Sequence, residues 1–235
     1  MAAAICMMMG FNLPLNFDSP YKAVNIVDFW KRWHITLTKF FTKYIYIPLG
    51  GNRKGAVRTY INLMIVFLIS GLWHGSGWTF IVWGAMHGLL YVVTRALKKE
   101  LPLPGAVKII LTFIYVTLAW VFFRAATVKD ALALIGRIFT CGTKPIATAL
   151  SSCFQLDELW YVIKVTPLMR FGFVWDVCLW LFVIAAVIII FFAKNAVTRA
   201  RECTIGLKTT LLTGVLIVWS VVTFAGVSTF LYMNF

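Results

Sequence analysis

TYINLMIVFLISGLWHGSGWTFIVWGAMHGLLYVVT, residues 59–94, consists of two uncharged apolar runs on either side of WHGSG. The runs cover residues 59–72 and 78–94, and basic residues flank both outer ends. Glycine costs about 1 kcal/mol in a helix interior, so the three glycines between residues 71 and 77 indicate irregular backbone. The stretch therefore predicts a hairpin of two membrane helices.

The rest of the chain extends this membrane pattern. Runs 106–123, 173–193 and 209–233 are uncharged or nearly so, and at about 20 residues each is long enough to cross a ~30 Å hydrocarbon core. Of the 235 residues, 61% are hydrophobic and only 13% are charged, whereas soluble domains average about 45–50% apolar and 25% charged residues. We expect an all-α, polytopic membrane helix bundle of about five hydrophobic helices, forming one membrane domain over residues 1–235.

The net charge of +14 points to a membrane orientation and not to nucleic acid. The cations lie between the apolar runs, where the positive-inside rule accounts for them. They are densest in segments 22–58, 95–108 and 194–208, which we expect to be cytoplasmic. The five cysteines form no CxxC pair, so the sequence indicates neither a disulfide framework nor a metal site.

Residues 28–46, DFWKRWHITLTKFFTKYIY, have the pattern of one amphipathic helix. Such a basic helix with an aromatic face is typical of the membrane interface. A second short interfacial helix is expected at DALALIGRIF, in the loop 124–172. In residues 28–46 the aromatic and aliphatic arc is made by Trp30, Trp33, Leu37, Phe40, Phe41 and Tyr44, and the opposite arc by Lys31, Arg32, Lys39 and Lys43.

The three histidines differ in their expected roles. At 1.5 Å per residue, His74 lies roughly 24 Å along its helix from Arg58, and an ionisable residue at such depth is a candidate functional residue. His34 falls at the edge of the aromatic arc, where a packed structural histidine is an equal alternative. His87 is expected to hydrogen-bond across packed helices, because Gly84 and Gly88 form a small-residue face beside it.

IPLGGNRKG, residues 47–55, predicts a turn that carries Arg53 and Lys54. The spacing does not match a phosphate-binding P-loop. Two alternatives remain at this point, a solvated basic turn and a contact for an anionic donor.

Six motifs in chain order resemble the membrane-bound O-acyltransferase family, and more narrowly its alginate O-acetyltransferase branch. The family's members carry several further membrane helices before the region that matches MGFNLPLNF, so the resemblance implies the C-terminal part of such a fold, truncated at the N-terminus. One departure is the ending LYMNF in place of an aromatic-Gln-Phe ending. The motifs are DFWKRWHITL (28–37), YIPLGGNR (46–53), GLWHG (71–75), WGAMHG (83–88), VFFRA (121–125) and FAGVSTFLY (224–232).

The resemblance implies an O-acyltransferase with His74 and His34 as catalytic residues. A neutral imidazole can accept the proton of a hydroxyl nucleophile, which makes this assignment chemically sound. His34 is expected at the cytoplasmic interface and His74 toward the opposite side, at the two mouths of a tunnel. The predicted substrate contacts are Arg53, Lys54, Trp73 and Trp33.

The implied reaction moves an acetyl group from a cytoplasmic thioester, acetyl-coenzyme A or another acyl thioester, toward hydroxyls of an exported polysaccharide such as alginate. No bound cofactor is expected. The expected partners are the lipid bilayer and periplasmic acetyl-transfer proteins, and the expected location is the bacterial inner membrane. The alternatives are a non-catalytic membrane scaffold or remnant of such an enzyme, and an acyltransferase acting on lipid or protein.

Overall fold

The structure is a computed structural model that describes residues 9–11, 13–97, 102–140, 165–167, 173–204 and 206–223, together with Cys6 and Phe171. It divides into two compact units, Met1–Ala193 and Lys194–Phe235. Within the described residues every regular element is a helix, which confirms the all-α fold class. The single membrane domain over residues 1–235 stays a prediction.

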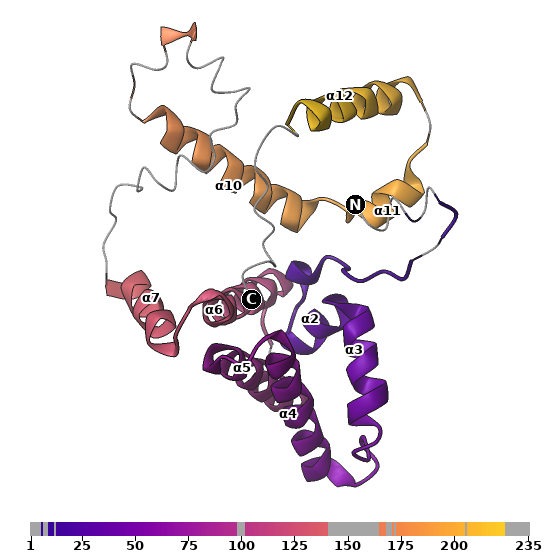
Figure 1. Cartoon of the computed structure of the whole chain (residues 1–235), viewed down its shortest axis with the longest axis vertical. Helices are drawn as coiled ribbons and strands as arrows, with labels where there is room; N and C mark the ends of the chain where they lie inside the picture. The colour runs from indigo at the N-terminus through magenta and orange to yellow at the C-terminus, as the bar shows by residue number, and fades with distance from the viewer. Residues whose placement is uncertain are drawn as a thin grey trace. The chain divides into compact units, whose positions relative to one another are not determined.

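The hairpin around WHGSG is made by α4 (Gly55–His74) and α5 (Trp78–Ala96), which lie side by side (Figure 1). A Cβ atom added at Gly71 would collide with the carbonyl oxygen of Phe80, and one at Gly84 with that of Phe67. The two helices therefore touch backbone to backbone. Gly71 belongs to this contact inside α4, so the irregular backbone is shorter than expected and covers only residues 75–77.

Two further helices of the first unit correspond to predicted apolar runs, α6 (Gly105–Arg124) and α10 (Val174–Phe192). The amphipathic segment of loop 124–172 forms α7 (Val128–Thr140). By length and hydropathy, α4 and α6 are the helices of the described chain that could span a membrane. Large apolar side chains on α4, α6 and α10 are exposed, including Val57, Ile110 and Ile189, as expected of a lipid-facing surface.

The prediction of one continuous helix over residues 28–46 is wrong. The structure has α2 (Ile26–Arg32), a break at Trp33 and His34, then α3 (Ile35–Phe41) and the π-helical turn η2 (Thr42–Tyr46). His34 adopts a left-handed conformation with φ 43°, which interrupts a right-handed helix.

The break is stabilised from far away in the sequence. The amide N–H of Ile35 donates to the carbonyl oxygen of Asn16 (3.0 Å), and the N–H of Thr36 donates to Asn16 Oδ1 (3.0 Å). These are two of the amides that a helix start leaves without partners. Asn16 therefore caps α3 from 20 positions upstream.

Because of the break, the aromatic arc predicted for residues 28–46 is divided between two surroundings. Trp30 is only 8% exposed and packs against Phe67 in the middle of α4, whereas Phe40 and Tyr44 are more than half exposed. The α3–η2 segment runs beside α4 toward the turn that joins them (Figure 1). Its place at the membrane interface stays a prediction.

The second unit contains α11 (Ala196–Glu202) and α12 (Leu207–Thr223). Asn195 caps α11 by accepting from the N–H of Thr198 (2.9 Å), and Lys194 pairs with Glu202 (2.6 Å). Helix α12 is apolar and covers the first part of run 209–233; the residues after 223 lie outside the described part of the chain.

Candidate active site

The two predicted catalytic histidines contact the same indole. The centroid of the Trp73 ring lies 4.8 Å from that of His74 and 6.4 Å from that of His34. The imidazoles are close enough for positive charges on them to repel each other. The expectation that they lie at opposite mouths of a tunnel is therefore wrong: they belong to one site.

The break between α2 and α3 explains this proximity. A continuous helix over residues 28–46 would carry His34 along one straight axis. Instead, Trp33 packs into the bundle and the chain turns at His34, which begins α3 at the end of α4 where His74 lies. His34 thus both interrupts the helix and contributes its imidazole to the site.

His74 is surrounded by aromatic rings from three helices. Its imidazole lies 5.3 Å from the ring of Trp83 on α5, nearly perpendicular to it, and 4.8 Å from that of Phe123 at the end of α6. Phe80 stacks at 6.5 Å. These walls limit the access of water to the imidazole, which strengthens any charge interaction made there.

His34 is half-buried, and its Nδ1 atom is buried with no hydrogen-bond partner among the described residues. Desolvation by burial lowers the pKa of His34, and a hydrogen bond of its own backbone partly opposes this effect. The unperturbed value is about 6.5. His34 is therefore a neutral imidazole at pH 7, able to accept a proton.

The two predicted tryptophan contacts differ in accessibility. The Trp73 side chain is 57% exposed, so it can meet a substrate. Trp33 is half-buried: it stacks on Phe29 with centroids 5.6 Å apart and lies 5.1 Å from Trp120. We interpret Trp73 as a candidate substrate contact and Trp33 as part of the wall behind His34.

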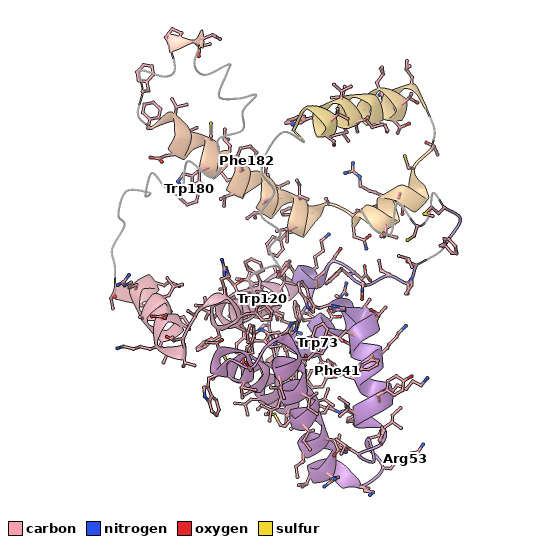
Figure 2. The ribbon with its side chains drawn as sticks, viewed as in Figure 1. Phe41, Arg53, Trp73, Trp120, Trp180 and Phe182 are labelled. Atoms are coloured by element: carbon pink, nitrogen blue, oxygen red, sulfur yellow. The ribbon has the colours of Figure 1, made fainter. Side chains whose placement is uncertain are left out.

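Arg53 and Lys54 lie at the opposite end of α4 from Trp73 (Figure 2). A 20-residue helix is about 30 Å long. The buried amide of Asn62 holds their turn against α4 by donating to the carbonyl oxygens of Gly51 (2.9 Å) and Leu49 (3.3 Å). The structure therefore does not bring Arg53 and Lys54 to the histidines.

His87 has the structural role predicted for it. It is fully buried, and its Nδ1 accepts a hydrogen bond from the indole N–H of Trp30 (3.3 Å). The acceptor role of Nδ1 places the imidazole proton on Nε2. His87 thus ties α2 to the middle of α5.

The sequence reasoning did not find three residues of the site: Asn16, Trp83 and Phe123. Trp83 and Phe123 lie within the WGAMHG and VFFRA motifs, so those motifs were a usable signal. Asn16 lies outside all six motifs. The N–H of Gly75, in the loop beside His74, donates to the carbonyl oxygen of Leu72 (3.2 Å) and is already committed.

A family model described as "MBOAT, membrane-bound O-acyltransferase family" matches residues 1–128. A peptidoglycan O-acetyltransferase of Helicobacter pylori is 50% identical over 140 residues, which is 57% of this chain and 27% of that protein. The protein named "Probable alginate O-acetylase AlgI" of Pseudomonas putida is 43% identical over 60% of this chain and 30% of its own length. A teichoic acid D-alanyltransferase of Streptococcus thermophilus is 32% identical over 42% of this chain and 26% of its own length. The chain spans less than a third of the length of each of these relatives.

Proposed function

The chain belongs to the membrane-bound O-acyltransferase family, and from this membership we propose that it transfers an acetyl group to hydroxyls of a carbohydrate polymer. The names of the relatives support this choice of acceptor, since peptidoglycan and alginate both carry sugar hydroxyls. They also support acetyl as the acyl group, because the O-acetylating relatives reach 43–50% identity and the D-alanylating relative 32%.

The observation that carries the proposal is the meeting of His34 and His74 around Trp73. A hydroxyl is a weak nucleophile near neutral pH and needs a base within reach as it attacks. Two imidazoles beside one exposed indole provide such a base and a surface on which a sugar ring can rest.

In the proposed reaction His74 is the general base. Its imidazole takes the hydroxyl proton while the oxygen forms a bond to the thioester carbonyl carbon. The tetrahedral intermediate collapses with cleavage of the C–S bond, and the imidazolium returns the proton to the departing thiolate. An O-acetyl ester and a free thiol result. Proton transfer of this kind contributes typically 10²–10⁴-fold to rate.

His34 acts beside this base as a second neutral imidazole. Its burial disfavours the charged form, and a positive charge on it would oppose the imidazolium that forms on His74. We assign His34 to holding the acceptor hydroxyl by a hydrogen bond, with His74 taking the proton.

The donor is an acyl thioester supplied from the cytoplasm, such as acetyl-coenzyme A, and the acceptor polymer is exported. The protein is a membrane protein by family; its placement as a multi-pass protein of the bacterial inner membrane is part of the proposal. Periplasmic proteins that pass the acetyl group onward would be its partners. The two alternatives are an acyltransferase that acts on lipid or protein and a non-catalytic scaffold. The test described next distinguishes them from the proposal.

The test supplies [1-¹⁴C]acetyl-coenzyme A to membranes that contain the protein, with peptidoglycan fragments, alginate, lipid or protein as acceptor. We expect alkali-labile label, diagnostic of an O-ester, on a carbohydrate. The His74→Gln variant should lose it, whereas Lys129→Gln, at an exposed position on α7, should retain it. Label on lipid or protein alone would show that the acceptor is a lipid or a protein and not a carbohydrate. No His74-dependent label on any acceptor would favour the scaffold.

A further inference from the structure

The chain segment 16–18, hereafter the clamp, lies across the turn between α2 and α3. Before the turn, the amide N–H of Asp18 donates to the carbonyl oxygen of Arg32 (2.9 Å). After the turn, the carbonyl oxygen of Asn16 accepts from the first N–H of α3 (3.0 Å). The clamp and the turn therefore run in opposite directions, and hydrogen bonds join them on both sides of His34.

The side chain of Asn16 adds a second pair of contacts at the start of α3. Its Oδ1 accepts from the N–H of Thr36 (3.0 Å) and from the hydroxyl of the same residue (2.8 Å). An alanine at position 16 would lose both of these contacts and keep the bond made by its own carbonyl oxygen. The side-chain amide can thus be removed without removing the rest of the clamp.

Phe17, in the middle of the clamp, packs on the turn itself. Its ring lies 4.9 Å from that of Trp33 and 5.8 Å from the imidazole of His34. The left-handed backbone of His34 is unfavourable for a residue with a Cβ atom. Such a conformation persists only where its surroundings hold it. The clamp provides such surroundings, with hydrogen bonds on both sides of His34 and a ring against its side chain.

The clamp is itself fixed to the bundle by the residues that follow it. The short 3₁₀ helix η1 (Pro20–Lys22) begins directly after Ser19, and Pro20 is buried. The ring of Tyr21 lies 5.5 Å from that of Phe113 on α6 and 6.2 Å from that of Trp33. The position of the turn therefore depends on contacts with α6 as well as on α2.

We propose that Asn16 is a positioning residue for acyl transfer, which holds the His34 imidazole beside Trp73 and His74. The inference rests on the proposed function, because the place of His34 matters to turnover only if the two imidazoles act in the reaction. Asn16 acts through His34 and makes no bond to the substrate. A displacement of about 1 Å caused far from the reacting atoms can cost about 10²-fold in rate. The alternative is a cap that only stabilises α3.

The test compares Asn16→Ala with Asn25→Ala in transfer from labelled acetyl-coenzyme A, in membranes that contain the whole chain. Asn25 is a matched control, because its Oδ1 caps α2 by accepting from the N–H of Asp28 (2.8 Å). Each variant loses a side-chain cap, so both should lower the unfolding temperature to a similar extent. Asn16→Ala should also lower kcat about 10- to 100-fold, whereas Asn25→Ala should change it less than about threefold.

Two further variants separate positioning from folding. Asn16→Asp keeps an oxygen for both Thr36 contacts, so its kcat should lie within about threefold of the wild type. In a His34→Asn background, which tolerates the left-handed backbone, Asn16→Ala should lower kcat less than about twofold further, because effects that act through one residue are not additive. An undiminished further loss in that background, or equal effects of Asn16→Ala and Asn25→Ala on kcat, would overturn the proposal.

The exchange of the imidazole C2 hydrogen for deuterium, followed by mass spectrometry, is a readout that needs no turnover. It should be several-fold faster at His34 in Asn16→Ala than in the wild type, because a displaced imidazole meets more water. The fully buried His87 is the internal control and should not change. This result in a protein that transfers no acetyl group would support the positioning of His34 and remove the proposed function. Acetyl transfer with both kcat and His34 exchange unaffected by Asn16→Ala would do the reverse.

Discussion

The indole N–H of Trp30 donates to Nδ1 of His87 across 3.3 Å, in the interior of the bundle. Trp30 is 8% exposed and His87 is fully buried, so neither group can turn to water if the other is lost. The bond joins the short α2 to α5, and Phe29, the neighbour of Trp30, stacks on the same imidazole at 6.2 Å.

Replacing His87 by Phe should therefore destabilise the fold. Loss of the acceptor leaves the Trp30 N–H buried without its partner, which costs about 1–3 kcal/mol. The double variant with Trp30→Phe should recover part of this loss, since both polar groups are then gone. Thermal unfolding in detergent of the wild type, the two single variants and the double variant measures the coupling between Trp30 and His87. Strictly additive effects on stability would contradict the hydrogen bond.

His74→Gln, unlike His87→Phe, should lower activity and leave stability nearly unchanged. Glutamine has about the same size and can hydrogen-bond, but it accepts no proton at neutral pH. We expect the acetyl-transfer kcat to fall by about 10²–10⁴-fold with little change in unfolding temperature. Near-normal turnover would remove His74 from the base role and leave His34 as the better candidate.

The contact between α4 and α5 predicts effects of opposite sign for two glycines. Gly84→Ala places a methyl group against the carbonyl oxygen of Phe67, which cannot rotate away, and such overpacking costs typically 1–3 kcal/mol. Gly136→Ala in α7 meets nothing within 4 Å and should stabilise its helix by up to about 1 kcal/mol. Unfolding temperatures measure both, and a stabilising Gly84→Ala would rule out the backbone contact.

The lowered pKa of His34 predicts a pH dependence of stability. Below the unfolded-state value of about 6.5, the unfolded chain binds a proton at His34 more readily than the folded chain. The contribution of the neutral His34 imidazole to the free energy of unfolding is therefore complete above that pH, and it is lost as pH falls through the folded-state pKa. We expect the unfolding temperature to fall less between pH 7.5 and 5.5 in His34→Asn than in the wild type. Asparagine is the suitable replacement because it tolerates the left-handed backbone.

The charge pattern predicts that the basic end of the hairpin is cytoplasmic. Cysteines introduced at Lys54 and Lys98 should resist an impermeant maleimide added to intact cells, whereas one at Ser76, in the exposed loop between α4 and α5, should react. Labelling of the first two and protection of the third would reverse the orientation.

The sequence predicts the helices well because long apolar runs leave few alternatives. Runs 59–72, 78–94 and 106–123 lie within α4, α5 and α6, and the Gly84 contact is visible as a small-residue pattern. The sequence does not predict the break at His34. The apolar period of residues 28–46 continues through it, and the groups that stabilise it belong to Asn16.

The site itself could be predicted only in part. Motifs identify His34 and His74 separately, but their common contact with Trp73 depends on that break. The resemblance predicts Arg53 and Lys54 as substrate contacts, yet the length of α4 separates them from the histidines. Residue types were thus readable, and distances between remote segments were not.

The cap supplied by Asn16 makes the position of His34 depend on a distant segment. Helix α3 has seven residues, and an isolated helix of that length does not persist in water. Its first two amides bond with Asn16, far upstream in the chain. The meeting of the two imidazoles at Trp73 therefore depends on a contact that lies outside the six motifs.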